Sequence, residues 1–515
     1  MSRNKTITKG KEAREKVVAG VNKAADAVAP TLGPVGLTAL IEYPGLDPIT
    51  ADDGVTVLRN LQFEDRHENM GLALLKKGAM RSSAEGGDGT ATTTVLTRAF
   101  LNEAMDEVGE DSSKIREVRD RLDKGLVEAL EALKDMSVPV KDEDLERIAE
   151  VSSLDPEVAK LIAEVIREVG PTGAITVEKG AKLGLSHEVV KGMRFDRGLI
   201  SPFFINDHEN AQTVLEDAYV VLVDRTIASN EQIVPLLNSI GTGKHILFIA
   251  TDIQGVALGT LAKNAMAGIA SIACVQNPYN ATPARDFLFD LAAITGATVI
   301  SEEMGMRLEE ATKEQCGRAE KIVITRDNTT VIGGKGDTAT RVKELEGKLD
   351  KSVSEFGTAQ LKDRIAALTG GIGVIRVGAY TDMEYNAKKY KFDNAIASTQ
   401  AAVQEGILPG GGVALVDIAV VHTDEMFKRA LMAPIQQMAT NAGMLKKVEG
   451  VAIGKGEGFN FKSGEYVNML GTGIIDPHKV VRTTLESAVA MTKQLIGFET
   501  AITITGNTDS HDVTN

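Results

Sequence analysis

The sequence has no tryptophan, few aromatic residues and only two cysteines in 515 residues. Cys274 and Cys316 provide neither a disulfide framework nor the ligand spacing of a zinc site. We therefore expect two buried, inert thiols in a protein of a reducing compartment. The seven histidines are scattered without a paired spacing, so we expect no transition-metal site made by protein side chains.

Long apolar runs and an excess of positive charge are also missing. No stretch reaches the roughly 18 apolar residues of a membrane span, and Glu12 and Glu15 fall in the first expected helix, which disfavours a targeting peptide. The formal net charge is −15, with no prominent Lys/Arg run, which argues against a nucleic-acid partner. We expect a cytoplasmic protein with no membrane partner.

Apolar residues make up 43% of the chain, enough for large cores. Helical periodicity dominates up to about residue 170, short β-branched runs alternate with amphipathic helices over 172–370, and helices return afterwards. This order predicts a multidomain α/β protein in which one α-helical domain is split by an α/β insertion.

A glycine-rich loop, Gly86-Gly87-Asp88-Gly89-Thr90, separates two expected helices. Glycines allow a close approach to the backbone, and a helix N-terminus offers unpaired N–H groups that suit phosphate oxygens. Asp88 is suited to hold Mg²⁺ on such phosphates. On its own the stretch also fits a plain turn that caps a helix, and it is not a P-loop because no Gly-Lys-Ser/Thr follows.

Two further stretches have the same ambiguity. The loop Thr31-Leu32-Gly33-Pro34 and the triple glycine Gly410-Gly411-Gly412 either bring a backbone to a ligand or simply turn the chain. Asp52 and Asp53 precede a short helix, where paired acids orient water, bind a cation or cap the helix. Two helices of the α/β segment have apolar faces, which form either core or an exposed groove for other polypeptides.

Taken together, these motifs show that the sequence resembles the GroEL-type (group I) chaperonin subunit. The resemblance runs nearly end to end and rests on Thr31-Leu32-Gly33-Pro34, Asp53-Gly54-Val55, Glu68-Asn69-Met70-Gly71, Gly87-Asp88-Gly89-Thr90, Gly192-Met193-Arg194-Phe195-Asp196-Arg197-Gly198, Ser201-Pro202-Phe203-Phe204-Ile205-Asn206, Ile300-Ser301-Glu302-Glu303, Gly410-Gly411-Gly412-Val413-Ala414-Leu415 and Gly473-Ile474-Ile475-Asp476-Pro477.

The resemblance implies the chaperonin fold with three domains. An equatorial ATP-binding domain would comprise residues 1–134 and 404–515, and an intermediate domain 135–190 and 372–403. An apical domain for substrate proteins would comprise 191–371. Hinges would lie at Gly192 and Gly371.

The resemblance also implies an ATPase with ATP and Mg²⁺ as cofactors. Asp53 and Asp393 would be the catalytic acids, with Asp393 carried to the nucleotide by the intermediate domain. Asp88 would hold Mg²⁺, and backbone oxygens of Thr31 and Asp52 would offer a K⁺ site. Nucleotide contacts are expected at Thr31, Leu32, Gly33, Pro34, Asp88, Gly89, Thr90, Ala91, Thr92, Gly411, Asn460, Ile474 and Asp476.

The expected partners are non-native polypeptides, other copies in a homo-oligomeric, heptameric ring, and a lid co-chaperonin. ATP would drive encapsulation, release and refolding of the client. Its apolar surface would be an exposed groove rather than core, formed by Leu199, Phe203, Phe204, Val234, Leu237, Leu258 and Ala262.

The sequence also departs from the family pattern. Asp52 replaces a lysine, Lys263 occupies a usually apolar groove position, and Phe461 and Lys462 replace small residues near the base. The segment expected between rings lacks its usual acids, which favours a single ring. Two rival interpretations are a ring that binds clients with little hydrolysis, which Asp52 would favour, and a metabolic phosphotransferase, for which the sequence supplies no acceptor site.

Overall fold

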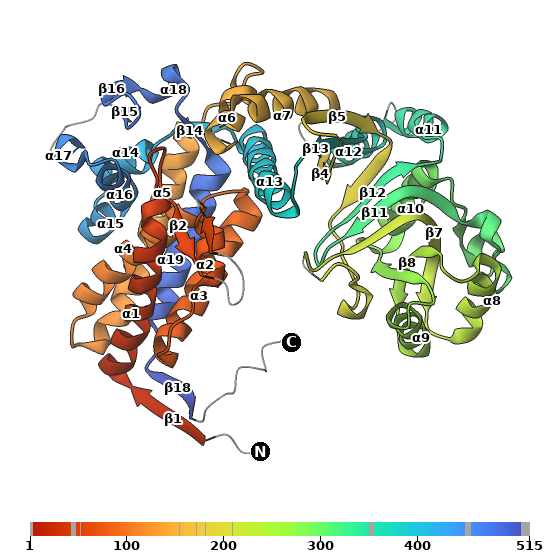
Figure 1. The fold of residues 1–515 in the computed structure, drawn as a ribbon, viewed down its shortest axis with the longest axis horizontal. Helices are drawn as coiled ribbons and strands as arrows, with labels where there is room; N and C mark the ends of the chain where they lie inside the picture. Colours follow the sequence, from red (N-terminus) through yellow and green to blue (C-terminus); the bar gives the residue numbers. More distant parts are fainter. Residues whose placement is uncertain are drawn as a thin grey trace. The chain divides into compact units, whose positions relative to one another are not determined.

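The computed structural model describes residues 4–42, 48–51, 53–153, 155–170, 173–180, 182–208, 210–349, 355–448 and 455–505, drawn as a ribbon in Figure 1. The chain folds into two compact units. Unit 1 comprises Met1–Ala163 and Tyr390–Asn515, and unit 2 comprises Glu164–Lys389. The chain therefore leaves the first unit, builds the second and returns, as the change in sequence pattern predicts.

Unit 1 is mainly helical. Its helices are α1 (Gly10–Val28), α2 (Gly54–Asn60), α3 (Arg66–Gly86), α4 (Thr90–Val108), α5 (Ile115–Met136), α6 (Asp144–Ser153), α14 (Val413–Val421), α15 (Glu425–Leu431), α16 (Ala433–Asn441), α17 (Leu445–Val448), α18 (Met469–Thr472) and α19 (His478–Ile496). Helices α7 (Pro156–Val169) and α13 (Asp382–Glu405) run across the division into unit 2.

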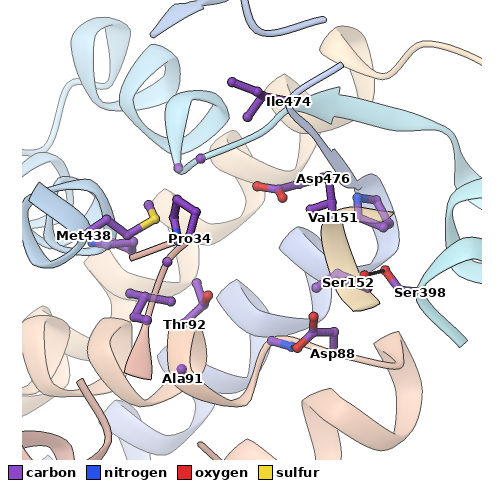
Figure 2. Close-up of a pocket in the computed structure, with 18 of the residues that line it drawn as sticks. Pro34, Asp88, Ala91, Thr92, Val151, Ser152, Ser398, Met438, Ile474 and Asp476 are labelled. Atoms are coloured by element: carbon purple, nitrogen blue, oxygen red, sulfur yellow. Dashed lines mark hydrogen bonds between the residues drawn. The ribbon is translucent and has the colours of Figure 1, made fainter. Parts of the chain in front are cut away.

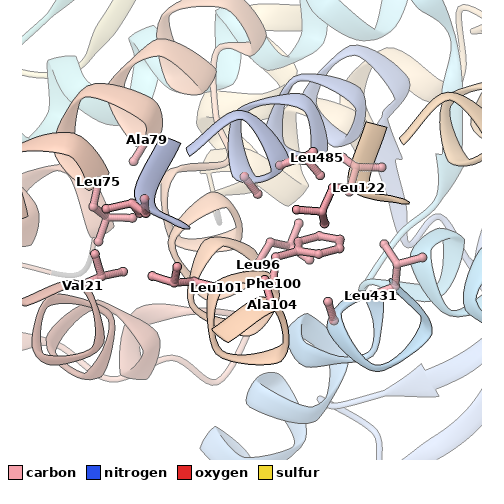
Figure 3. Close-up of a cluster of buried hydrophobic side chains, with 14 of the residues drawn as sticks. Val21, Leu75, Ala79, Leu96, Phe100, Leu101, Ala104, Leu122, Leu431 and Leu485 are labelled. Carbon is pink, nitrogen blue, oxygen red and sulfur yellow. The ribbon is translucent and has the colours of Figure 1, made fainter. Parts of the chain in front are cut away.

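The core of unit 1 lies among α1, α3, α4, α5 and α19, and Figure 3 shows its side chains. Phe100 of α4 is fully buried and meets Phe427 edge to face, with ring centroids 4.7 Å apart. Helices α1 and α3 cross closely because Gly20 faces Glu68, where a Cβ would lie 2.0 Å from the backbone oxygen. This packing holds α4, and the first turn of α4 borders the site described below.

Four small antiparallel sheets complete unit 1. They pair β1 (Asn4–Lys9) with β18 (Thr500–Thr505), β2 (Ala39–Ile41) with β3 (Ile49–Ala51), β14 (Ile407–Pro409) with β17 (Ile475–Pro477), and β15 (Glu457–Asn460) with β16 (Glu465–Asn468).

Unit 2 is built on a seven-stranded mixed sheet in the order β6-β12-β11-β7-β8-β9, with β10 beside β7. Strands β7, β8 and β9 are parallel to one another. The strands are β6 (Gly192–Phe195), β7 (Thr213–Ile227), β8 (His245–Ile253), β9 (Ser271–Gln276), β10 (Val299–Ile300), β11 (Gly317–Ile324) and β12 (Thr329–Gly334).

Helices cover both faces of this sheet. Side chains alternate along a strand, so Leu222 of β7 joins the core beneath α10 (Ala281–Thr295), while Val223 joins the core beneath α8 (Asn230–Ile240) and α9 (Gly255–Met266). Figure 1 shows α8 and α9 on the opposite side of the sheet from α10. The remaining helices are α11 (Ala339–Leu349) and α12 (Glu355–Gly370).

A second sheet of unit 2 has three strands in the order β4 (Ala174–Lys179), β13 (Ile372–Val377) and β5 (Leu185–Val190). The two expected hinge glycines lie close to it. A Cβ on Gly192 would meet the Ile372 side chain at 2.6 Å, and one on Gly371 would meet the Val190 carbonyl oxygen at the same distance. The chain thus enters and leaves the large sheet at neighbouring points.

The division into two units falls inside both segments expected to form the intermediate domain, and the three-domain boundaries stay a prediction. Among the described residues we find no helix with the length and hydropathy of a membrane span. Cys274 and Cys316 are both free and buried, as predicted. Burial raises the pKa of the Cys316 thiol to about 12, so it stays protonated and unreactive.

Candidate nucleotide site

A cavity of about 670 Å³ opens within unit 1, a volume suited to a ligand of nucleotide size. Figure 2 shows its walls. The cavity brings together residues that are far apart in the sequence. All thirteen expected nucleotide contacts line it, as does Asp53: Thr31, Leu32, Gly33, Pro34, Asp88, Gly89, Thr90, Ala91, Thr92, Gly411, Asn460, Ile474 and Asp476.

The loop between α3 and α4 forms one wall. Gly87 ends α3 at φ 87° and Gly89 precedes α4 at φ 100°, both in the left-handed region that favours glycine. A Cβ on Gly87 would lie 2.5 Å from the Cβ of Ala397 on α13. The loop is therefore packed tightly beneath α13, and the first N–H groups of α4 remain without helical partners beside the cavity.

Asp88 and Asp53 place two carboxylates beside this helix start. Asp88 accepts a hydrogen bond from the Gly89 N–H at 2.6 Å, and Asp53 caps α2 by accepting the Thr56 N–H at 2.7 Å. The Asp88 side chain reaches the cavity but is closely surrounded by protein, and this desolvation, followed by the charge of Asp53, raises its pKa. A cation between the carboxylates and a phosphate would relieve both effects.

Thr90 supplies an unsatisfied group at the same place. The residue is 4% exposed, and its Oγ1 is buried without a hydrogen-bond partner among the described residues. A buried hydroxyl that makes no hydrogen bond is costly, so the observation points to a ligand atom that completes it.

Asp476, the middle residue of β17, borders the opposite wall. It accepts hydrogen bonds from the backbone N–H groups of Gly411 and Gly412, so it holds the triple-glycine loop in place. Burial, followed by the charge of Asp88, raises the pKa of Asp476 to about 6 against those two hydrogen bonds. The carboxylate has acceptor capacity left for a hydroxyl of a ligand.

One end of the cavity is mainly apolar. Phe461 is 4% exposed and packs edge to face on Phe459, with centroids 5.3 Å apart, and Ile474 and Met438 line the same cavity. The Oδ1 of Asn460 accepts the backbone N–H groups of Lys462 and Ser463, which leaves its amide hydrogens to donate. A flat heterocycle suits such a slot.

A family model of TCP-1/cpn60 chaperonins matches residues 24–503. The chain belongs to the TCP-1/cpn60 chaperonin family. The resemblance found in the sequence is thereby confirmed.

Two solved structures are similar to this chaperonin. Both are of the chaperonin gp146 from the bacteriophage EL 2 (Pseudomonas aeruginosa), crystallised in the presence of ATP-BeFx in two crystal forms. The similarity has TM-scores of 0.70 and 0.63 at 21% sequence identity, and covers 98% of this chain and 99% of that chain in each case. It confirms the predicted chaperonin fold.

Two predicted site residues are not placed in the cavity. Asp393 is described but is not among the residues that line it, whereas its neighbour Asn394 is. Asp52 lies outside the described residues, so its expected backbone contact to K⁺ stays a prediction. The Thr31 hydroxyl donates to the Val28 carbonyl at 2.8 Å, and Thr31 lines the cavity.

The structure adds lining residues that the sequence did not single out. Glu150 and Ser152 come from α6, and Tyr390, Lys391 and Ser398 come from α13. Along α13, residues 390, 394 and 398 recur every four positions and so share one helix face. That spacing was the available signal, but nothing in the sequence indicated which face of α13 meets the cavity.

The donor set of this chaperonin fits Mg²⁺ bound together with a phosphate. Among the described residues there is no group of three or more His, Cys, Asp or Glu side chains placed to hold a metal ion. Mg²⁺ commonly uses one or two carboxylates and completes its shell with phosphate oxygens and water. Asp88 and the nearby Asp53 provide two such carboxylates.

The expected client surface is only partly exposed. Phe203 and Val234 are 60% and 40% exposed, while Leu199, Leu237 and Leu258 are half-buried against the sheet. The other two residues correct the prediction. Phe204 and Ala262 are 2% and 7% exposed and belong to the core beneath α8 and α9, because the turn carrying Phe204 packs onto α9.

Two further exposed apolar side chains, of which the sequence did not single out Val256, extend this surface along α9. Val256 and Met266 are 65% and 68% exposed. We define the apical apolar surface as Phe203, Val234, Val256 and Met266, all of unit 2.

Proposed function

We propose that this chaperonin binds Mg·ATP in the cavity of unit 1 and hydrolyses it. The observation that carries the proposal is the buried Thr90 hydroxyl without a partner, beside the N-terminus of α4 and the Asp88 carboxylate. Phosphate oxygens would accept from the Thr90 hydroxyl and the first N–H groups of α4. Asp88 would hold Mg²⁺, which neutralises phosphate charge during the reaction.

The rest of the nucleotide fits the other walls. Asp476 would accept a ribose hydroxyl, and the base would lie against Phe461, Ile474 and the amide of Asn460. The crystals of gp146 were grown in the presence of ATP-BeFx, and this supports a nucleotide ligand in the shared fold.

Asp53 is the carboxylate that we propose as the base in hydrolysis. One of its oxygens is engaged by the Thr56 N–H, and the other remains to orient water. In the proposed reaction the water oxygen bonds to the γ-phosphorus, the bond to the β,γ-bridging oxygen breaks, and ADP leaves. The water proton passes to Asp53 or to the released phosphate.

We further propose that hydrolysis controls the binding of non-native polypeptides. Exposed apolar segments of a client would be buried on the apical apolar surface, at roughly 25 cal/mol per Å². Rotation about Gly192 and Gly371 would withdraw that surface and release the client. The proposed assembly is a homo-oligomeric ring of seven chains, closed by a lid co-chaperonin, with K⁺ supporting the nucleotide site.

Asp88→Asn tests the nucleotide site. We expect it to reduce Mg²⁺-dependent phosphate release at least about tenfold, since one charge of the proposed metal site is lost. Asp106→Asn is the matched control, because Asp106 is an exposed carboxylate near the far end of α4, the helix that follows the Asp88 loop. Calorimetric titration that detects no Mg·ATP binding to the unmodified chaperonin would refute the proposal.

A further inference from the structure

Helix α13 presents neutral side chains to the carboxylate end of the cavity. Tyr390 and Asn394, one helical turn apart, both line the cavity. Asp393 immediately precedes Asn394 and points about 100° away around the helix, and it is not among the described residues that line the cavity. The helix therefore brings a phenol and an amide to the site, where the sequence predicted an acid.

Tyr390 lies within electrostatic reach of both site carboxylates. Its pKa is raised by burial first and then by the charges of Asp53 and Asp88, while a hydrogen bond with the Asn394 side chain opposes the rise. The phenol thus stays protonated. Its oxygen has acceptor capacity for the Asn394 amide, and its hydrogen is available to donate.

Contacts on either side hold this face of α13 in place. Ala397 packs against the backbone of Gly87, as the 2.5 Å approach of a Cβ there indicates. The hydroxyls of Ser152 and Ser398 hydrogen-bond at 2.8 Å and connect α13 to α6. Tyr390 therefore projects from a helix that is already fitted to the loop carrying Asp88.

We propose that Tyr390, oriented by Asn394, is a positioning residue for the γ-phosphate of ATP, and that Asp393 is not required for hydrolysis. The inference rests on the proposed function. The Tyr390 hydroxyl would donate to a γ-phosphoryl oxygen. A neutral donor suits this position because Asp53 and Asp88 already supply two negative charges, and a third acid would repel the phosphate.

Comparing the binding of two nucleotides distinguishes a contact of Tyr390 with the γ-phosphate from a purely structural role of Tyr390. Binding of Mg·ADP and of Mg·ADP with beryllofluoride, a γ-phosphate mimic, is measured by calorimetry on the full chain. Tyr390→Phe removes only the hydroxyl. We expect about tenfold weaker binding of the beryllofluoride complex, less than about twofold change for ADP, and about tenfold lower kcat, as for one lost charge-assisted hydrogen bond.

The control variants lie on α13 or just before it. Tyr380→Phe removes a hydroxyl from a side chain that is 82% exposed, and should change none of these values more than about twofold. Asp393→Asn should also leave kcat within about twofold. Asn394→Ala should reproduce the selective loss seen in Tyr390→Phe, because the phenol loses its orienting partner.

The possible outcomes distinguish a failure of the proposed function from a failure of the proposed role of Tyr390. If the unmodified chaperonin binds neither nucleotide, the proposed function fails. If it binds and hydrolyses ATP but Tyr390→Phe weakens both nucleotides equally or neither, the positioning role is wrong while the function stands. A loss of kcat in Asp393→Asn that exceeds the loss in Tyr390→Phe would also overturn the inference.

Discussion

The Ser152 hydroxyl donates a hydrogen bond to the Ser398 hydroxyl over 2.8 Å, and both side chains line the nucleotide cavity. Figure 2 shows this bond near Asp88. It connects α6 with α13, two helices separated by more than 200 residues of intervening chain. Both helices therefore contribute walls to a site whose other walls come from the glycine loops.

Gly87→Ala should destabilise the chaperonin by about 2–3 kcal/mol. The φ of 87° strains any residue with a Cβ, and that Cβ would also clash with Ala397 at 2.5 Å. Gly170→Ala is the matched control, because Gly170 has a φ of 84° but nothing within 4 Å of the added Cβ. It should cost about 1 kcal/mol. Thermal unfolding of both variants checks the difference, and equal losses would show that α13 does not press on the loop.

Thr90→Val should weaken ATP binding while leaving the nucleotide-free protein as stable as before or more so. Valine has nearly the same shape, and it removes a buried hydroxyl without a partner, whose desolvation is otherwise uncompensated. Thr94→Val is the comparison, because the Thr94 hydroxyl donates to the Thr90 carbonyl at 2.8 Å and its loss should be destabilising. A lower melting temperature for Thr90→Val without nucleotide would contradict the assignment.

Asp476 should make the nucleotide-free protein less stable as the pH rises from about 4 to 6. Its pKa is raised from 3.8 to about 6, chiefly by burial, so the folded state binds more protons than the unfolded state in that window. The stabilising effect is complete below pH 4 and is lost above pH 6. Asp476→Asn should therefore be more stable at pH 7, by about 3 kcal/mol of unfolding free energy, and should equal the parent protein at pH 4. A lower melting temperature at pH 7 would contradict this account.

Val234→Glu should reduce the capture of a chemically denatured protein by the chaperonin. A charge placed on the apical apolar surface opposes burial of apolar client segments. Val420→Glu on α14 is the control, because Val420 is also exposed, at 69%, but lies in unit 1. Suppression of client aggregation, followed by light scattering, should fall for Val234→Glu alone. An equal loss in both variants would place client binding elsewhere.

Much of the fold was predictable because the patterns were local. The helical period of α1 and α5 and the β-branched strands of unit 2 reflect which face each element buries. The buried state of Phe204 was not predictable in the same way. It depends on a turn packing onto α9, a tertiary contact that a short apolar motif does not specify.

The site was predictable where glycines and acids fall in fixed loops, as at Gly87, Asp88 and Gly89. It was not predictable along α13, where Asp393 and Asn394 are adjacent in sequence but differ by about 100° in direction. The contact of Ala397 with Gly87 sets the rotation of that helix. The sequence motif indicates which residues are candidates, but the packing of the helix determines which of them lines the cavity.

ATP turnover by the purified chaperonin, with particle mass followed by light scattering in the same samples, tests the central claim most directly. Phosphate release is measured with and without Mg²⁺, and with and without K⁺. We predict Mg²⁺-dependent turnover, without any added acceptor, in a particle of about seven chain masses or a multiple of it. A particle of the 54.8 kDa single-chain mass that neither binds nor hydrolyses ATP would contradict the account.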